Sequence, residues 1–391
     1  MGIIFFADTA QYTLLPLTFT RPVADLRVGI LTIAEKWQKY LQQDTSFITL
    51  NYLQQKFPLK IAEQNLLINS SICPDEALLE AINNLQEGQV LKQQNLLIAA
   101  HISGPNVKNW ESVITSFINI NYTQKLVKIT YPEDIFMLND AELRKDFVLL
   151  TKGKSSAAIS QTNTVLGEDF FAEEGATAEC ANFNTKLGPI YLSKNSEVFE
   201  GANIRGSFFL GECSQVKMGA KIYGGTTIGP HCTVGGEIKN SVLWGYSSKG
   251  HEGYLGNSVL GEWCNIGADS NNSNLKNTYA EVKLWDYSTK KLRNTGLQFC
   301  GLIMADHAKC GINTMFNTGT MVGVNSNVFG AGYPPKFIPD FSWGGISHNE
   351  IYAINKALET AKLVFERKGR NFNEVETQIL THIFNLTSNL K

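Results

Sequence analysis

The stretch LGPIYLSKNSEVFEGANIRGSFFLGECSQVKMGAKIYGGTTIGPHCTVGGEIKNSVLWG, residues 187–245, repeats in steps of six. An aliphatic residue stands at every sixth position, and the residue four places later is often small. Leu, Ile and Val make up about a quarter of ordinary sequence, so eight of them in one register arise by chance with a probability on the order of 10⁻⁵. The series is Leu192, Val198, Ile204, Leu210, Val216, Ile222, Ile228 and Val234.

A period of six fits neither a helix of 3.6 residues per turn nor a strand of period two. It is typical of hexapeptide repeats, in which a short strand and a turn recur on each flat face of a parallel β-helix. The aliphatic residues are expected to point into the coil, with glycine or a polar residue in the turns. The frame restarts at Leu260 and returns over residues 304–328. The sequence therefore predicts a left-handed parallel β-helix over residues 165–346.

Two segments interrupt or follow this repeat. Residues 269–298, rich in Asn and Lys, break the period and are predicted to leave the coil as a loop, which shapes a binding site or is a mere surface flap. Residues 347–391 carry apolar residues at helical spacing and predict two C-terminal helices, which cap the open end of the coils or form a subunit contact.

The first 150 residues alternate apolar runs with amphipathic segments. This alternation predicts a Rossmann-like α/β domain with a largely parallel sheet over residues 1–150. The polar, small residues 151–164 are predicted to be a linker. Strands are expected at 3–6, 66–69 and 96–100, and helices at 31–43, 75–85 and 109–120.

Composition excludes several classes of protein. The 34 basic and 36 acidic residues of the 391-residue chain give a net charge of −2, which argues against a nucleic-acid or membrane binder. The first residues lack the cationic lead-in of a signal peptide, and no apolar run approaches the ~20 residues of a spanning helix. The seven cysteines show no CxxC pair and are expected to be reduced thiols. We therefore expect a multidomain cytoplasmic protein.

One segment of the first domain suggests phosphate binding. Residues 14–37, LLPLTFTRPVADLRVGILTIAEKW, place Arg21, Arg27 and Lys36 around a loop that leads into a helix. Cations beside a helix N-terminus suit an anionic phosphate. The alternative is ordinary surface charge.

Taken together, the two halves resemble the bifunctional N-acetylglucosamine-1-phosphate uridyltransferase/glucosamine-1-phosphate N-acetyltransferase family, and more closely its variant branch in Bacteroidetes-type bacteria. The resemblance covers nearly the whole chain and is more specific in the second half. It implies a sugar nucleotidyltransferase-like first domain and acetyl-CoA as co-substrate, bound between neighbouring subunits of a homotrimer. It rests on residues 14–37 and on DFVLLTKGKSS (146–156), GPHCTVGGEIKNSV (229–242), GHEGYLGNSVLGEWCNIGAD (250–269) and KCGINTMFNTGTMVG (309–323).

The resemblance implies an acetyltransferase site in the β-helix. The motif GHEGYLG corresponds to the family's stretch with a catalytic histidine and a substrate-binding tyrosine, and a histidine of near-neutral pKa can take a proton from the attacking amine. His307 is a rival base. The implied residues are His251 as base, with Lys239, Tyr254, Asn265, Asn274 and the less securely aligned Lys217 as substrate-binding residues.

The first domain departs from the family pattern. The family's glycine-rich loop is absent, although Arg21 and Arg27 fall where the family has its loop arginine and a lysine. Ile72 stands at the position of the family's metal-binding Asp. Nucleotidyl transfer relies on Mg²⁺ to neutralise phosphates, so either this branch binds the metal differently or the domain only binds a sugar nucleotide. The candidate replacement ligands are Asp8, Asp75 and Asn139.

Three functions follow from these patterns. The first is a two-step enzyme that acetylates glucosamine 1-phosphate and then uridylylates the product to UDP-N-acetylglucosamine, a cell-wall precursor. The second is an acetyltransferase whose first domain only binds a sugar nucleotide. The third is a nucleotidyltransferase for another sugar phosphate, with the β-helix as an oligomerisation scaffold.

Overall fold

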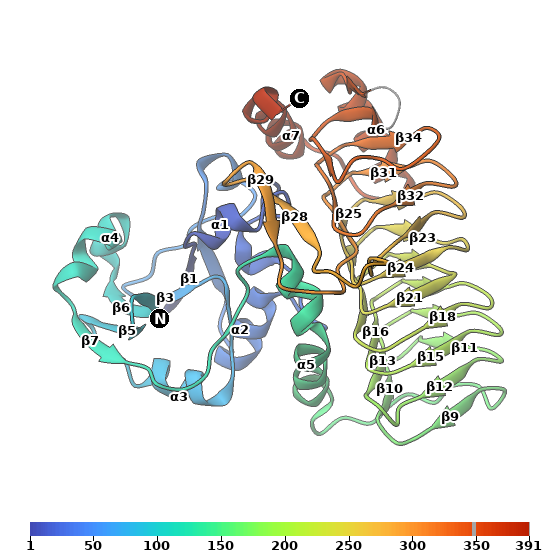
Figure 1. Ribbon diagram of the computed structural model, residues 1–391. Coiled ribbons are helices and arrows are strands. Elements are labelled where there is room, and N and C mark those ends of the chain that lie inside the picture. The colour runs from blue at the N-terminus through green and yellow to red at the C-terminus, as the bar shows by residue number, and fades with distance from the viewer. Residues whose placement is uncertain (346–348, 391) are drawn as a thin grey trace. The chain divides into compact units, whose positions relative to one another are not determined.

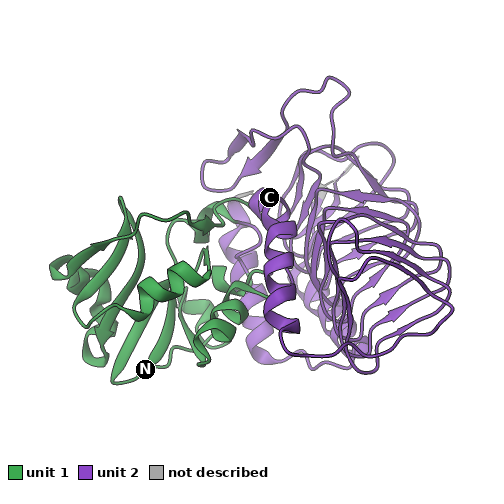
Figure 2. Cartoon of the chain, turned by 90° about the horizontal axis from the view of Figure 1, so that it is seen from below, with its two compact units in different colours: residues 1–14, 20–26, 31–131 green, residues 15–19, 27–30, 132–391 purple. Residues whose placement is uncertain are grey.

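The computed structural model of the protein describes residues 1–345 and 349–390 (Figure 1). The predicted boundary between residues 346 and 347 lies outside these residues. The chain forms two compact units, which Figure 2 colours separately. The first unit comprises Met1–Leu14, Thr20–Leu26 and Leu31–Tyr131, and the second comprises Leu15–Phe19, Arg27–Ile30 and Pro132–Lys391.

The first unit is built on a six-stranded sheet of order β2-β1-β3-β6-β5-β7. Strand β1 pairs in parallel with both β2 and β3, whereas β6 is antiparallel to β3 and β5. The predicted α/β architecture is confirmed, and the sheet is mixed rather than largely parallel, because β5 and β6 form a hairpin. The strands are β1 (Gly2–Phe6), β2 (Thr45–Ile48), β3 (Gln64–Asn69), β5 (Gln89–Gln93), β6 (Leu96–Ser103) and β7 (Ile118–Asn121).

The helices of this unit begin at residues suited to that role. Helix α2 (Ile33–Leu41) has a capping box, in which the Thr32 hydroxyl accepts from the Glu35 N–H and the Glu35 carboxylate accepts from the Thr32 N–H. Helix α3 (Glu76–Asn83) begins after Asp75, whose carboxylate accepts a hydrogen bond from the N–H of Leu78.

The predicted helix over residues 109–120 is wrong. The structure has only the four-residue helix α4 (Trp110–Val113) and a short 3₁₀ turn, and strand β7 follows. The β-branched residues Ile118 and Ile120 lose side-chain freedom in a helix, and in β7 they lie on a strand that pairs with β5. The apolar spacing alone did not separate these alternatives.

The second unit is a parallel β-helix, which confirms the predicted fold class. Residue Ile190 pairs with Phe208 and Phe208 with Thr226, so one full coil takes 18 residues, or three hexapeptides. The coils stack their short strands into three parallel sheets (Figure 1). Each coil therefore contributes one strand to each face.

The strands of the three faces follow one another in chain order. The first face contains β10 (Phe170–Ala172), β13 (Ile190–Leu192), β16 (Phe208–Leu210), β19 (Thr226–Ile228), β22 (Val242–Gly245), β25 (Val259–Glu262), β30 (Leu302–Met304), β33 (Thr320–Val322) and β35 (Phe337–Ile338). The second contains β11 (Thr177–Ala178), β14 (Glu197–Val198), β17 (Gln215–Val216), β20 (Thr233–Val234), β23 (Ser248–Lys249), β26 (Asn265–Ile266), β31 (Lys309–Cys310), β34 (Asn327–Phe329), β36 (Ser342–Gly345) and the antiparallel β37 (Asn349–Ile351). The third contains β9 (Thr164–Leu166), β12 (Asn182–Asn184), β15 (Asn203–Arg205), β18 (Lys221–Ile222), β21 (Glu237–Lys239) and β24 (Tyr254–Gly256), and the pair β27 (Asn271–Asn272) and β32 (Met315–Phe316) forms a separate two-stranded sheet.

The aliphatic residues of the period-six series fill the interior of the coils. All eight residues from Leu192 to Val234 are at most 1% exposed and belong to one continuous hydrophobic core. Burying one such side chain contributes about 1.5–3 kcal/mol relative to leaving it exposed. The predicted inward orientation of the repeat is therefore confirmed.

The predicted break at residues 269–298 leaves the coils as a hairpin rather than a plain loop. Strands β28 (Lys283–Asp286) and β29 (Lys291–Asn294) pair antiparallel and project from the coils (Figure 1). The buried Tyr287 at the hairpin turn donates a hydrogen bond of 3.0 Å to Asp340. Its ring packs edge-on against Phe337, with the ring centroids 5.4 Å apart.

Helix α5 (Pro132–Thr151) packs with the coils, although the sequence analysis assigned most of it to the first domain. The buried amide of Asn139 donates to Gly225 O and to Thr227 Oγ1, at 2.8 and 3.0 Å. Its oxygen accepts from the N–H of Gly29 at 2.7 Å. A Cβ on Gly29 would lie 2.5 Å from a carboxylate oxygen of Asp146, so only glycine fits this approach.

The two predicted C-terminal helices are confirmed as α6 (Ile354–Arg367) and α7 (Glu374–Leu386). Helix α6 begins only at Ile354, because β37 precedes it and pairs with β36. Among the described residues no helix is long and apolar enough to cross a membrane.

A stack of aromatic rings holds α6 against the coils. His231, Tyr246 and Trp263 come from successive coils and lie nearly parallel, with ring centroids 4.9 and 4.1 Å apart. Phe365 of α6 stacks 3.8 Å from Trp263 and 5.9 Å from His307. Burial, followed by the nearby charge of Arg370, lowers the pKa of His231. The uncharged ring therefore suits this stack.

The stack predicts a large effect of one substitution. Phe365→Ala should destabilise the docked tail by roughly 3–4 kcal/mol, since it removes a buried aromatic ring. Limited proteolysis should then cleave the tail faster, and the thermal midpoint should fall. Leu363→Ala, on the same helix but 59% exposed, is the control and should change neither. Equal protection of the tail in the two variants would contradict the role of Phe365.

Candidate functional site

Two residues of the predicted acetyltransferase site meet on the third face of the coils. Tyr254 on β24 accepts a 3.0 Å hydrogen bond at its hydroxyl from the amide of Asn274, which also donates to Asn257 at 2.8 Å. A Cβ on Gly256 would lie 2.3 Å from the Tyr254 hydroxyl oxygen, so only glycine leaves space for this hydroxyl. Burial raises the pKa of Tyr254, so its hydroxyl stays protonated and can donate a hydrogen bond.

Lys239 stands on the neighbouring strand of the same face. In the β21–β24 register Glu237 pairs with Tyr254 and Lys239 with Gly256. The intervening Ile238 points into the core, so Glu237 and Lys239 point outward by strand alternation. Lys239 is exposed. This face therefore places a cation one strand away from the Tyr254–Asn274 pair.

His251 lies in the turn between β23 and β24, three residues before Tyr254. Its side chain is exposed. The turn is anchored through its carbonyls: Gly253 O accepts from the N–H of Glu237 at 3.2 Å, and Glu252 O accepts from the N–H of Asp269 at 3.1 Å. The backbone position of the histidine is thus set by neighbouring coils.

The other predicted residues lie apart from these contacts or are engaged elsewhere. Asn265 is exposed on β26, which belongs to the second face. Lys217 donates to Gln215 at 2.9 Å and lies 4.4 Å from the ring centroid of Phe199. The rival base His307 is 4% exposed and stacks within the aromatic column. Of the two histidines, His251 is the accessible one.

Lys249 is not among the site residues predicted from the sequence. It is 1% exposed, and its ammonium donates to the carbonyls of Gly235 and His251 at 3.0 and 2.8 Å. The interior residues Val234, Ile238 and Leu243 are four and five residues apart, so the period-six frame shifts before Lys249 and did not reveal that this lysine stands in the aliphatic column. A lysine two residues before the motif's histidine was the available signal.

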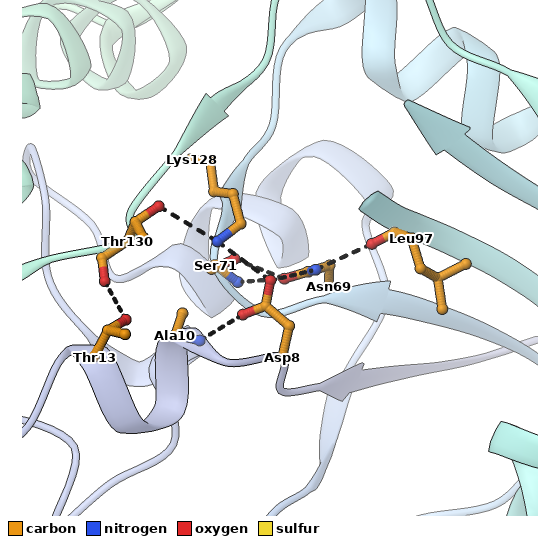
Figure 3. Close-up of polar contacts among 8 residues, drawn as sticks. All are labelled: Asp8, Ala10, Thr13, Asn69, Ser71, Leu97, Lys128 and Thr130. Carbon is orange, nitrogen blue, oxygen red and sulfur yellow. Dashed lines mark hydrogen bonds and ion pairs between the residues drawn. The ribbon is translucent and has the colours of Figure 1, made fainter. Parts of the chain in front are cut away.

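A polar cluster marks the strand ends of the first unit (Figure 3). Asp8, just after β1, forms a 3.2 Å ion pair with Lys128 and accepts a 3.1 Å hydrogen bond from the amide of Asn69 at the end of β3. The Asn69 oxygen accepts from both the N–H and the hydroxyl of Ser71, at 3.0 and 2.7 Å. Lys128 reaches this place because β8 (Val127–Lys128) pairs antiparallel with β4 (Ile72–Cys73).

The cluster lies at the place where open α/β sheets bind ligands. The strand order β2-β1-β3 makes the connections diverge from β1, and ligands bind outside the carboxyl ends of the strands at such a switch point. Two side-chain hydroxyls near these ends, on Thr49 after β2 and Ser70 after β3, are buried without a hydrogen-bond partner. Such groups are costly unless something bonds them. The first unit thus has a polar candidate site between β1 and β3.

The residues present do not fit the predicted Mg²⁺ site. Both oxygens of Asp8 are engaged, one by Lys128 and Asn69 and the other by the N–H of Ala10 at 2.8 Å. Asp75 caps α3, and the amide of Asn139 forms hydrogen bonds within the second unit. Within residues 1–345 and 349–390, no three or more His, Cys, Asp or Glu side chains gather as a metal cluster.

The three predicted phosphate-binding cations do not form one exposed group. Arg21 is 5% exposed and pairs with Asp25 at 3.2 Å, and Lys36 on α2 is 1% exposed. Arg27, which belongs to the second unit, donates to the carbonyl of Ile30. Their role in phosphate binding stays a prediction, and Lys128 is a cation of the strand-end cluster that the sequence analysis overlooked.

Parts of the chain are similar to known proteins. Residues 3–155 match the model of a family described as sugar nucleotidyl transferase. The curated relatives include the bifunctional protein GlmU of Methanocaldococcus jannaschii, 34% identical over 89 residues that cover 23% of this chain and 21% of the relative. They also include GlmU of Synechococcus elongatus, 23% identical over 163 residues that cover 40% of this chain and 32% of the relative. These matches agree with the prediction of a transferase, and they span no more than about a third of the relatives' length.

Two solved structures are similar to part of the chain. The polySia specific acetyltransferase NeuO is 14% identical with a TM-score of 0.28, covering 50% of this chain and 85% of its own. The UDP-N-acetylglucosamine acyltransferase from Campylobacter jejuni is 11% identical with a TM-score of 0.25, covering 60% of this chain and 83% of its own. At these scores neither likeness carries an argument about function.

The contacts of Asn139 predict a structural rather than a metal-binding role. Asn139→Ala should lower the free energy of unfolding by roughly 2–5 kcal/mol, because it leaves buried backbone groups of Gly29 and Gly225 without partners. Urea unfolding measures this loss. Met137→Ala, on the same helix and 51% exposed, is the control. An unchanged urea midpoint combined with lost Mg²⁺ dependence would restore the metal-ligand interpretation.

Proposed function

We propose that the protein is a two-step enzyme of sugar-nucleotide synthesis. Its β-helix acetylates glucosamine 1-phosphate from acetyl-CoA, and its first unit transfers UMP from UTP to the product, giving UDP-N-acetylglucosamine. The observation that carries this proposal is the Tyr254–Asn274 pair beside Lys239, with His251 three residues away in the adjoining turn. Residues 3–155 of the same chain match a sugar nucleotidyl transferase family. The variant Bacteroidetes-type branch and a homotrimeric assembly are part of the same proposal.

The acetyl-transfer step assigns a role to each residue. The amine nitrogen of the sugar attacks the thioester carbonyl, the bond from carbonyl carbon to sulfur breaks, and coenzyme A leaves as a thiol. His251 takes the proton that the amine loses, which suits a solvent-accessible imidazole. Lys239 binds the sugar phosphate, and the hydroxyl of Tyr254 and amide of Asn274 orient the sugar. Backbone amides of a coil turn stabilise the oxyanion.

In the first unit, Lys128 is proposed to bind an anionic phosphate at the β1–β3 switch point. Its partner Asp8 holds the ammonium at the strand ends in the described structure. The phosphate would replace or share this carboxylate contact, because an ammonium has three N–H donors. No step is assigned to a metal ion.

Two observations favour a second candidate function. The loop after β1 contains no glycine up to Gly29, and the carboxylate of Asp8 is already paired. A first unit that only binds a sugar nucleotide fits these features, with acetyl transfer as the sole reaction. A nucleotidyltransferase for another sugar phosphate, with the β-helix as a scaffold, is the remaining alternative.

Acetyl transfer is tested by following free thiol in a mixture of protein, acetyl-CoA and glucosamine 1-phosphate. The thiol should appear only when the sugar phosphate is present. His251→Ala should lower the rate by roughly 100-fold or more without unfolding the protein, since general-base catalysis contributes typically 10²–10⁴-fold. His307→Ala is the comparison, with its thermal midpoint recorded. Full activity of His251→Ala together with loss in a folded His307→Ala would transfer the role of base to His307.

Nucleotidyl transfer is tested by pyrophosphate release from UTP and N-acetylglucosamine 1-phosphate. Lys128→Met should raise the KM for UTP at least about tenfold, because it removes a charge-assisted phosphate contact. Lys125→Met, three residues earlier and exposed, is the matched control and should behave as the wild type. Absence of pyrophosphate with the wild type, but saturable binding of UTP, would favour the binding-only first unit. Turnover with another nucleotide and sugar phosphate would favour the third alternative.

A further inference from the structure

Lys249 is a charged residue in a column of aliphatic side chains. It pairs with Val234 on the preceding coil, and the neighbouring pair Ser248–Asn265 places it next to Ile266 on the following coil. Val234 and Ile266 both belong to the hydrophobic core. Burying a cation among such residues is unfavourable unless its N–H groups are hydrogen-bonded. A lysine at this position therefore needs a contact that an aliphatic residue cannot make.

That contact joins two successive turns. The Lys249 ammonium donates to the carbonyl of Gly235, in the turn after β20, and to the carbonyl of His251, in the turn after β23. A Cβ on Gly236 would lie 2.9 Å from the Lys249 nitrogen and 2.8 Å from the oxygen of His251, so the earlier turn leaves space for this contact. One side chain thus ties the turn of His251 to the coil before it.

The turn of His251 has three anchored carbonyls in succession. Those of Glu252 and Gly253 accept from backbone N–H groups of other coils, and that of His251 accepts from Lys249. The Lys249 contact is made by a side chain, so a substitution can remove it and leave the backbone ladder intact. The imidazole of His251 is exposed. Its position therefore depends mainly on the backbone of residue 251 rather than on packing of the ring.

Charges on neighbouring elements act on Lys249 in both directions. Burial lowers its pKa to about 8, whereas Glu252, Asp269 and Cys310 raise the pKa and Lys221 lowers it. The amine is therefore mostly protonated at neutral pH. Both of its hydrogen bonds also survive deprotonation, because a neutral amine keeps two N–H groups.

We propose that Lys249 is a positioning residue for His251: it fixes the turn that carries the catalytic base by clamping the carbonyl of His251 to that of Gly235. The inference rests on the proposed acetyl transfer and extends it to a residue inside the coil. It explains why a lysine interrupts an otherwise apolar column at the one coil whose turn carries the histidine.

Lys249→Met keeps an unbranched apolar stem and removes the clamp. We expect kcat for acetyl transfer to fall roughly 10- to 100-fold, as misplacement of a catalytic group does, while the KM for glucosamine 1-phosphate changes less than about twofold. In a His251→Ala background the same substitution should not lower the residual rate further, because the two residues act as one unit. A merely structural role would lower the rate equally in both backgrounds.

Lys309→Met is the matched control. Lys309 is partly buried, its ammonium donates to the carbonyl of His307 at 2.8 Å, and burial lowers its pKa to about 8. This variant should leave kcat unchanged. Unchanged kcat in Lys249→Met, or an equal loss in the two lysine variants, would overturn the proposal.

A second measurement is independent of activity. Hydrogen exchange of the amides of residues 250–256 should become faster in Lys249→Met and stay as in the wild type in Lys309→Met. Unchanged exchange in Lys249→Met would overturn the clamp even if the wild type transferred no acetyl group. A wild type that transfers no acetyl group, with faster exchange in this variant, would instead reject the proposed function and retain the clamp.

Discussion

The second unit depends on the register with which each coil hydrogen-bonds to the next. A parallel ladder in which Ile190, Phe208 and Thr226 stand in line fixes the length of a coil, and this length decides which side chains face inward. Since inward and outward positions alternate along each short strand, one register places the aliphatic series inside and the polar residues outside. A slip by one residue would exchange the two sets. The candidate acetyltransferase residues occupy the outward positions and turns that this register leaves available.

The same register explains how residues of different coils come together in the candidate site. Tyr254 and Lys239 are fifteen residues apart in sequence, but the β21–β24 pairing places them on adjacent strands of one face. Asn274 reaches the Tyr254 hydroxyl from the start of the excursion that carries β28 and β29. The turn of His251 follows β23, whose interior position is Lys249. The candidate acetyltransferase residues therefore lie where the coils are shorter than 18 residues.

In the first unit, side-chain contacts hold the polar residues at the strand ends in place. Without a glycine-rich loop after β1, the strand ends are held by side chains: Asp8, Asn69 and Lys128 bond one another, and Asn69 also bonds Ser71. The unusual feature is a carboxylate already paired with a cation at the switch point. This arrangement suits the recognition of an anion better than the coordination of a metal ion, because the cation is in place and no carboxylate oxygen of Asp8 is unengaged.

The β-helix could be predicted from the sequence, because a six-residue period recurs along the coils and needs no knowledge of distant contacts. The sequence also predicted the C-terminal helices and the strands β1, β3 and β6, whose apolar runs are local. Residues 118–121 form a strand because they pair with β5, although the local pattern predicted a helix there. The ion pair of Lys128 with Asp8 joins residues 120 apart in sequence, and the hydrogen bonds of Asn139 are made to the coils. Neither contact could be predicted from the local sequence. The interior position of Lys249 is seen only from the pairing between coils, because two shortened coils shift the six-residue frame.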